Sequence, residues 1–187
     1  MELPSTAAGW SNGPSRPHSA EEQGMLQHLL FTYRFNLDRA RTLVGDLSDE
    51  QMVRQPNGVV NHPAWILGHL ALTSDHLAKL LDCESTFPAA WTDAFKPGGI
   101  PSGDAAAFPS KAEILDELAA QHERVAAALA NADPAIFARE HPSERARRRF
   151  PTIGDYAVFL MSSHEGSHLG QIAAWRRAMG LGSATGI

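Results

Sequence analysis

Apolar residues recur at steps of three and four along four stretches of this chain, a spacing that is typical of amphipathic helices. The alternating period of a β-strand is missing throughout. The first stretch follows a capping-box sequence that begins at Ser19. The pattern predicts one long helix there, with an apolar stripe at Leu26, Leu29, Leu30, Tyr33, Leu37, Ala40, Val44 and Leu47.

A second capping box at Ser48 predicts a short helix that ends at the turn residues Pro56, Asn57 and Gly58. Proline is acceptable in the first turn of a helix, so a second long helix is expected to begin at Pro63. Asn61 or His62 would cap it. Its apolar stripe runs through Ile66, His69, Leu70, Thr73, Leu77 and Leu80.

Two more start signals follow, a capping box at Ser110 and a cap sequence at Thr152. The first predicts a helix towards Asn131. The second predicts a last helix from about Ile153 to Met179, because Gly180 suits a left-handed C-terminal cap. The inward positions of this last helix are predicted to be Ile153, Tyr156, Leu160, His164, His168, Gln171 and Trp175.

Four long helices with short accessory helices predict an all-α fold, an antiparallel four-helix bundle. Residues 84–109 are rich in proline and glycine and carry Trp91, Phe95 and Phe108. A loop this long permits one crossover and is often functional, here as a lid or pocket wall; ordinary surface packing of its aromatic residues is the alternative. We expect residues 1–18 to form a disordered or extended tail and residues 19–187 to form one helical domain.

Composition and charge limit the classes of function. A net charge of -5 and a pI near 6.0 argue against nucleic-acid or membrane-surface binding, which needs an excess of Lys and Arg. No apolar run is long enough to span a bilayer. Residues 1–4 lack the basic and apolar regions of an export signal, so we expect a cytoplasmic protein. Cys83 is the single cysteine, which excludes an internal disulfide.

The last helix carries two histidines at metal-ligand spacing. His164 and His168 lie one turn apart and about 40° apart around the axis, so both rings can reach one ion. A further ligand must come from earlier in the chain, because residues 169–187 contain no His, Asp, Glu or Cys. His69 is the best candidate, since it lies on the apolar stripe of the second helix with a full turn on either side.

Other histidines are less suited. His62, His69 and His76 are about 10 Å apart along the helix, so only one of them can bind the ion. His76 is the fallback, and His62 is interpreted as a cap or surface residue. The remaining candidates have no partner at ligand spacing and are expected on the surface: His28, His122 and His141.

Three imidazoles leave a coordination position for water or substrate, which is the pattern of a catalytic ion. They accept Zn, Ni, Fe, Mn or Co, of which we expect zinc first. Glu165 points about 100° away from His164, where it would act as general base on a water at the ion. A solvated carboxylate, or an acceptor for a ligand imidazole, are the alternatives.

Further residues near these histidines carry expectations of their own. Gly166 and Gly170 would let a helix or substrate approach, and Gln171 would hydrogen-bond near the site. The basic residues from Arg145 to Arg149 are interpreted as solvated charge, with attraction of an anionic substrate as the alternative.

From about residue 20 to 180 the sequence resembles the DinB/YfiT-like superfamily of four-helix metalloproteins. The similar segments are residues 47–51, residues 65–70 and the block from His164 to Ile172 with Arg176 and Arg177. The resemblance implies a divalent ion held by His69, His164 and His168. It also implies thiol transferase or isomerase activity with mycothiol, bacillithiol or a related low-molecular-weight thiol; some members are called hydrolases. The chain departs from the family at Ser167, where a larger residue is frequent.

We therefore expect a metal-dependent enzyme that transfers or activates a thiol on a small-molecule substrate. A metal-dependent hydrolase with Glu165 as the base is the second hypothesis. The third hypothesis is a metal-stabilised bundle or metal-responsive interaction module without enzymatic activity, forming a homodimer through exposed helix faces.

Overall fold

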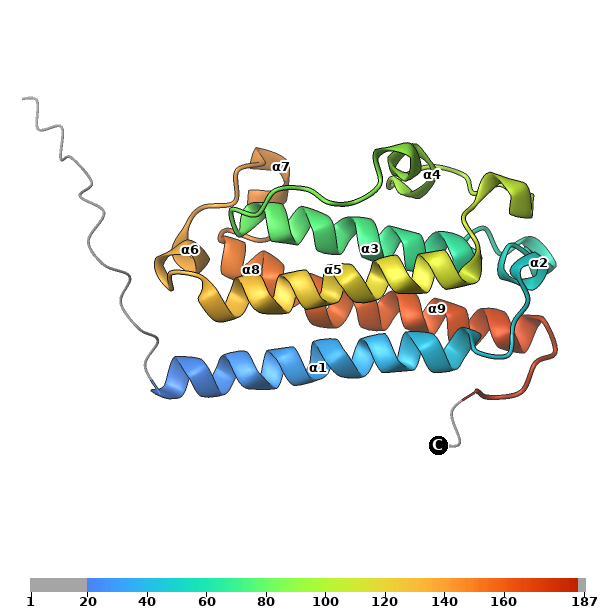
Figure 1. Cartoon of the computed structure of the whole chain (residues 1–187), viewed down its shortest axis with the longest axis horizontal. Coiled ribbons are helices and arrows are strands. Elements are labelled where there is room, and N and C mark those ends of the chain that lie inside the picture. The colour runs from blue at the N-terminus through green and yellow to red at the C-terminus, as the bar shows by residue number, and fades with distance from the viewer. Residues whose placement is uncertain (1–19, 185–187) are drawn as a thin grey trace, which may run out of the picture.

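The computed structural model describes residues 20–184, and its side chains from residue 24. Four long helical runs lie alongside one another: α1 (Ala20–Val44), α3 (Pro63–Leu80), α5 (Lys111–Asn131), and α8 (Ile153–Val158) continued by the π-helical turn η4 (Phe159–His164) and α9 (Glu165–Ala178). Helices α1 and α9 run in one direction and α3 and α5 in the other (Figure 1). The all-α bundle is confirmed, and no strand is present in the described part of the chain.

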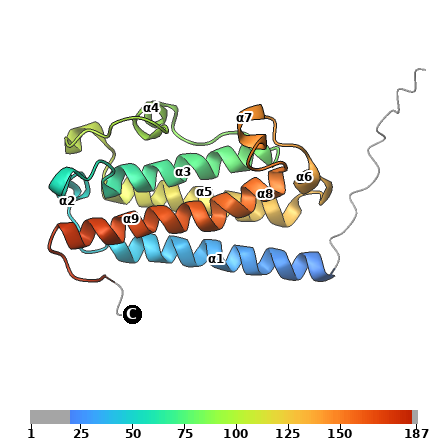
Figure 2. The same cartoon turned by 180° about the vertical axis from the view of Figure 1, so that it is seen from behind.

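Helices α1 and α3 are diagonally opposite in the bundle. Both pack against α5 and against the last helical run of η4 and α9, which lie between them. The parallel pair α3 and α5 requires the long crossover that the loop at 84–109 provides. Figure 2 shows α3 and α9 side by side on the rear of the bundle. Within residues 20–184, no helix combines the length and apolar character of a bilayer span.

Local capping chemistry sets most helix starts as predicted. Ser48, Ser110 and Thr152 each accept a hydrogen bond from the backbone N–H three residues on, and each is part of a complete capping box. The predicted turn at Asn57 and Gly58 is confirmed by positive φ angles of 53° and 77°. The capping box at Ser19 and the tail at 1–18 lie outside the described residues.

Short helices fill the connections. They are α2 (Asp49–Met52), η1 (Pro56–Gly58), η2 (Ala89–Trp91), α4 (Thr92–Phe95), η3 (Ala105–Ala107), α6 (Ala135–Ala138) and α7 (Glu144–Arg147). The loop between α3 and α5 is held by buried Asp75, whose carboxylate accepts hydrogen bonds from Ser85, Thr86, Phe87 and Arg124. Burial alone would raise the pKa of Asp75, but these bonds hold that pKa below its ordinary value.

The last helix turns a different face to the core than predicted. Four residues that were predicted to point inward are not buried: Tyr156, His164 and His168 are half-buried, and Gln171 is exposed. For His164, His168 and Gln171 the cause is the π-helical turn η4, which adds a residue to one turn and shifts the register of the helix after it. The two histidines therefore lie at the edge of the core. The buried residues are Ile153, Ala157, Leu160, Met161, Glu165, Leu169, Ile172, Trp175 and Arg176.

Candidate metal centre

Three histidines from two distant stretches of the chain meet between α3 and α9. His69 lies in the middle of α3, His164 ends η4, and His168 is one turn further along α9. One ring nitrogen of each lies within 4.8 Å of those of the other two. The ring centroids are 5.3 Å apart for His69 and His164, 5.1 Å for His69 and His168, and 4.6 Å for His164 and His168.

The histidine group is open on the side of His164 and His168. His69 is buried at 4% exposure, whereas His164 and His168 are half-buried. The structure thus brings together the three residues that the sequence proposed as ligands. It also leaves the two histidines of the last helix partly exposed.

The loop between α3 and α5 orients His69. The Nδ1 of His69 lies 3.0 Å from the backbone oxygen of Phe95. A carbonyl oxygen can only accept, so Nδ1 carries the proton and Nε2 keeps a free lone pair. Trp65 stacks on the same imidazole with ring centroids 4.8 Å apart and planes 5° from parallel.

Gly68 allows Phe95 to come this close. A Cβ added to Gly68 would lie 2.2 Å from a ring carbon of Phe95, so only glycine leaves room for that fully buried ring. The crossover loop is therefore more than surface packing, because its backbone orients His69 of the candidate centre.

The imidazoles are neutral at pH 7. Burial, with the nearby His168 and His69, lowers the pKa of His164 to about 3. Burial and His69 lower the pKa of His168 to about 4 against an opposing hydrogen bond from Gln171. Burial also lowers the pKa of His69. Neutral imidazole is the form that binds metal.

The donor set fits a divalent metal ion. The Nδ1 atoms of His164 and His168 are buried and have no hydrogen-bond partner among the described residues. Unpaired buried nitrogens are costly unless something else pairs with them. Three imidazoles facing one point are suited to Zn, Ni, Fe, Mn or Co.

Glu165 lies on the core side of the same helix, away from the open face. Its side chain is 4% exposed, and Oε1 lies 2.8 Å from the Nε2 of His122 on α5. Burial raises the pKa of Glu165, against opposing contributions from His122 and Asn36. The interpretation of Glu165 as a solvated carboxylate is wrong, and its role as a general base stays a prediction.

The environment of Glu165 is polar within an otherwise apolar core. Tyr33 stacks on His122 with centroids 3.7 Å apart, and its hydroxyl donates to Ser74 over 2.8 Å. Asn36 donates to the backbone oxygen of Met161 in η4 over 3.2 Å. His122 was not predicted to be buried, although it lies between Leu118 and Val125 on the apolar stripe of α5, and that position was the available signal.

The other histidines do not join the group. His76 and His28 are exposed, as expected for His28. His62 caps α3 by accepting from the N–H of Trp65, but it is fully buried rather than a surface residue. The expectation that His122 and His141 lie on the surface is wrong, since both are buried against aromatic rings.

Gly166 and Gly170 border open space, so no neighbouring helix packs closely against them. Gln171 is exposed, and its amide contacts Asn61 over 3.4 Å and His168. In the basic run, Arg147 and Arg148 form ion pairs with Glu140 and Glu144, respectively, at the surface.

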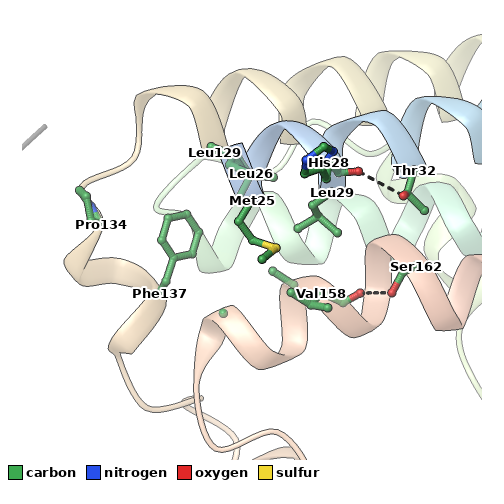
Figure 3. A pocket seen from close by; sticks show the side chains of 12 residues that line it. Met25, Leu26, His28, Leu29, Thr32, Leu129, Pro134, Phe137, Val158 and Ser162 are labelled. Carbon is green, nitrogen blue, oxygen red and sulfur yellow. Dashed lines mark hydrogen bonds between the residues drawn. The ribbon is translucent and has the colours of Figure 1, made fainter. Parts of the chain in front are cut away.

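A separate apolar hollow of about 520 Å³ lies away from the three histidines. Met25, Leu29, Phe137 and Val158 line it, together with residues from the ends of α1 and α5 (Figure 3). The hydroxyls of Thr32 and Ser162 at its rim donate to backbone oxygens one turn earlier, so neither is free to donate to a guest.

Fold and site together define a helical-bundle protein with a candidate three-histidine metal site. The family model that describes the DinB superfamily matches residues 32–172 of the chain. The chain therefore belongs to the DinB superfamily. Among curated proteins, none matches it.

Proposed function

We propose that the protein binds one divalent metal ion, with zinc as the first candidate, between His69, His164 and His168. The protein uses this ion in transfer or isomerisation chemistry with a small thiol. The observation that carries the proposal is the meeting of three neutral imidazoles with one open side. A divalent ion there would act as a Lewis acid and lower the pKa of a coordinated thiol. Three protein ligands leave a position for that thiol.

The chain's own residues prepare the site. The Phe95 carbonyl keeps the proton of His69 on Nδ1, so that Nε2 keeps the lone pair that a metal ion needs. Trp65 covers one face of the His69 ring and excludes water from it. These contacts fix the position of the imidazole, which reduces the reorganisation needed when an ion binds.

The contacts of Glu165 favour thiol chemistry over hydrolysis. A hydrolase would need a general base within hydrogen-bond reach of the reacting water, on the open side of the histidines. The Glu165 carboxylate instead lies 2.8 Å from His122 in the core. Within residues 24–184, no other carboxylate joins the three histidines as a candidate ligand.

Metal content tests the site directly. Protein purified without a His tag should contain one ion per chain, and His69→Ala, His164→Ala or His168→Ala should lose most of it. His76→Ala is the matched control, because His76 is exposed on the same helix as His69. Unchanged stoichiometry in the three ligand variants would remove the site from consideration.

Turnover tests the chemistry. Metal-loaded protein should accelerate attack of glutathione, mycothiol or bacillithiol on an alkyl halide, and chelation should abolish the acceleration. A protein that loses thermal stability on chelation, yet turns over none of these thiols, would instead be a metal-stabilised bundle without this activity.

A further inference from the structure

Three half-buried aromatic rings lie beside the candidate centre on the side of α8. We call Phe150, Tyr156 and Phe159 the aromatic shelf. The Phe159 ring is 5.6 Å from that of His164. Phe150 stacks on Phe159 with centroids 4.4 Å apart and planes 27° apart, and Tyr156 lies 5.3 Å from Phe150. The shelf is therefore continuous with the histidine group.

Like the histidines, the aromatic shelf lies along the seam where the last helical run packs against α3. Tyr156 reaches across to α3, where its ring lies 6.0 Å from that of His76, two turns beyond His69. All three shelf residues keep part of their surface exposed. A molecule bound at the open side of His164 and extending along the seam would meet the Phe159 ring first.

Aromatic rings also flank the histidines at the other end. Trp65 stacks on His69 and lies 6.3 Å from His168, on the side away from Phe159. Half-buried Phe159 and buried Trp65 thus place flat apolar rings on two sides of the histidines. Such surfaces favour flat apolar groups, because stacked rings attract one another beyond the gain from buried area.

We propose that the substrate of this centre carries a planar aromatic group close to its reacting atom, and that this group packs on Phe159 and Phe150. The inference rests on the proposed metal site but not on thiol chemistry. The distance of 5.6 Å from His164 to Phe159 requires a short connection between the ring and the atom that reaches the ion. Phe159 is a specificity-determining residue in this proposal.

Two matched chelating probes test it. Benzohydroxamate and cyclohexanecarbohydroxamate bind metal through the same group and differ in whether their ring is flat. Their dissociation constants are measured by calorimetry on zinc-loaded protein and on zinc-loaded Phe159→Leu. We expect the preference for the aromatic probe to fall about three- to tenfold in the variant.

The control is Phe35→Leu, which removes an exposed phenylalanine from α1 and should leave the preference unchanged. Phe150→Leu serves as a second variant should Phe159→Leu fail to fold, with the same expected loss. An unchanged preference in a variant that retains one zinc per chain would overturn the inference and leave the proposed site standing. Wild-type protein that binds no zinc would overturn both.

Discussion

Oε1 of Glu165 lies 2.8 Å from Nε2 of His122, and each side chain is 4% exposed. The contact joins α9 to α5 across the core, one residue after the candidate ligand His164. A buried carboxylate is costly unless it is paired, so this contact favours one rotation of the helix. The two adjacent residues therefore lie on different faces of the helix, His164 towards the candidate ion and Glu165 towards α5.

Removing His122 should destabilise the bundle. His122→Ala leaves the buried carboxylate of Glu165 without its partner and opens a cavity beneath Tyr33, so we expect a loss of about 3 kcal/mol in the free energy of unfolding. Urea denaturation measures it. Glu123→Ala, an exposed neighbour on α5, should change this free energy by less than about 0.5 kcal/mol. An equally small effect of His122→Ala would show that the contact contributes little.

Glu165→Gln separates an anchoring role from a catalytic one. Glutamine keeps the size of the side chain and a hydrogen-bonding oxygen, so metal content and thiol turnover should stay close to wild type. The measurements are elemental analysis and the initial rate with a thiol. A rate loss of about a hundredfold or more, with metal retained, would instead identify Glu165 as a general base.

Gly68→Ala should disturb the candidate centre from outside it. The new Cβ would lie 2.2 Å from the Phe95 ring, and moving that ring displaces the carbonyl that holds His69. We expect zinc affinity to fall about 10- to 100-fold, measured by competition with a chelator. Gly170→Ala is the control, because a Cβ there meets nothing within 4 Å. Equal affinities in the two variants would contradict the orienting role of Phe95.

Metal-free protein should lose stability as the pH falls below about 6.5. In the folded protein the pKa is about 3 for His164 and about 4 for His168, against an ordinary value of 6.5. Between these values the unfolded chain binds more protons than the folded protein, so acid favours unfolding. Above pH 6.5 these two residues contribute no pH dependence, because they are neutral in both states.

Thermal unfolding between pH 7 and pH 4 tests this effect. His168→Gln removes one of the two titrating groups, so its melting temperature should decline less steeply than that of wild type over the same range. Parallel declines in the two proteins would contradict the depressed pKa of His168.

Much of the fold follows from local chemistry that the sequence displays. Ser48, Ser110 and Thr152 cap helices through bonds to residues three positions away, and Gly180 ends the last helix with a φ of 72°. Such interactions depend on near neighbours alone, so a pattern in the sequence predicts them. The spacing of His164 and His168 made them candidates for the same reason.

Contacts between distant residues were decided only by the tertiary structure. The bond between His69 and Phe95 spans 26 positions, and the contact between Glu165 and His122 joins two different helices. The π-helical turn at Phe159–His164 moved the two histidines from the predicted core stripe to its edge. Helical periodicity records only which residues share a face, whereas packing against α1, α3 and α5 determines where that face points.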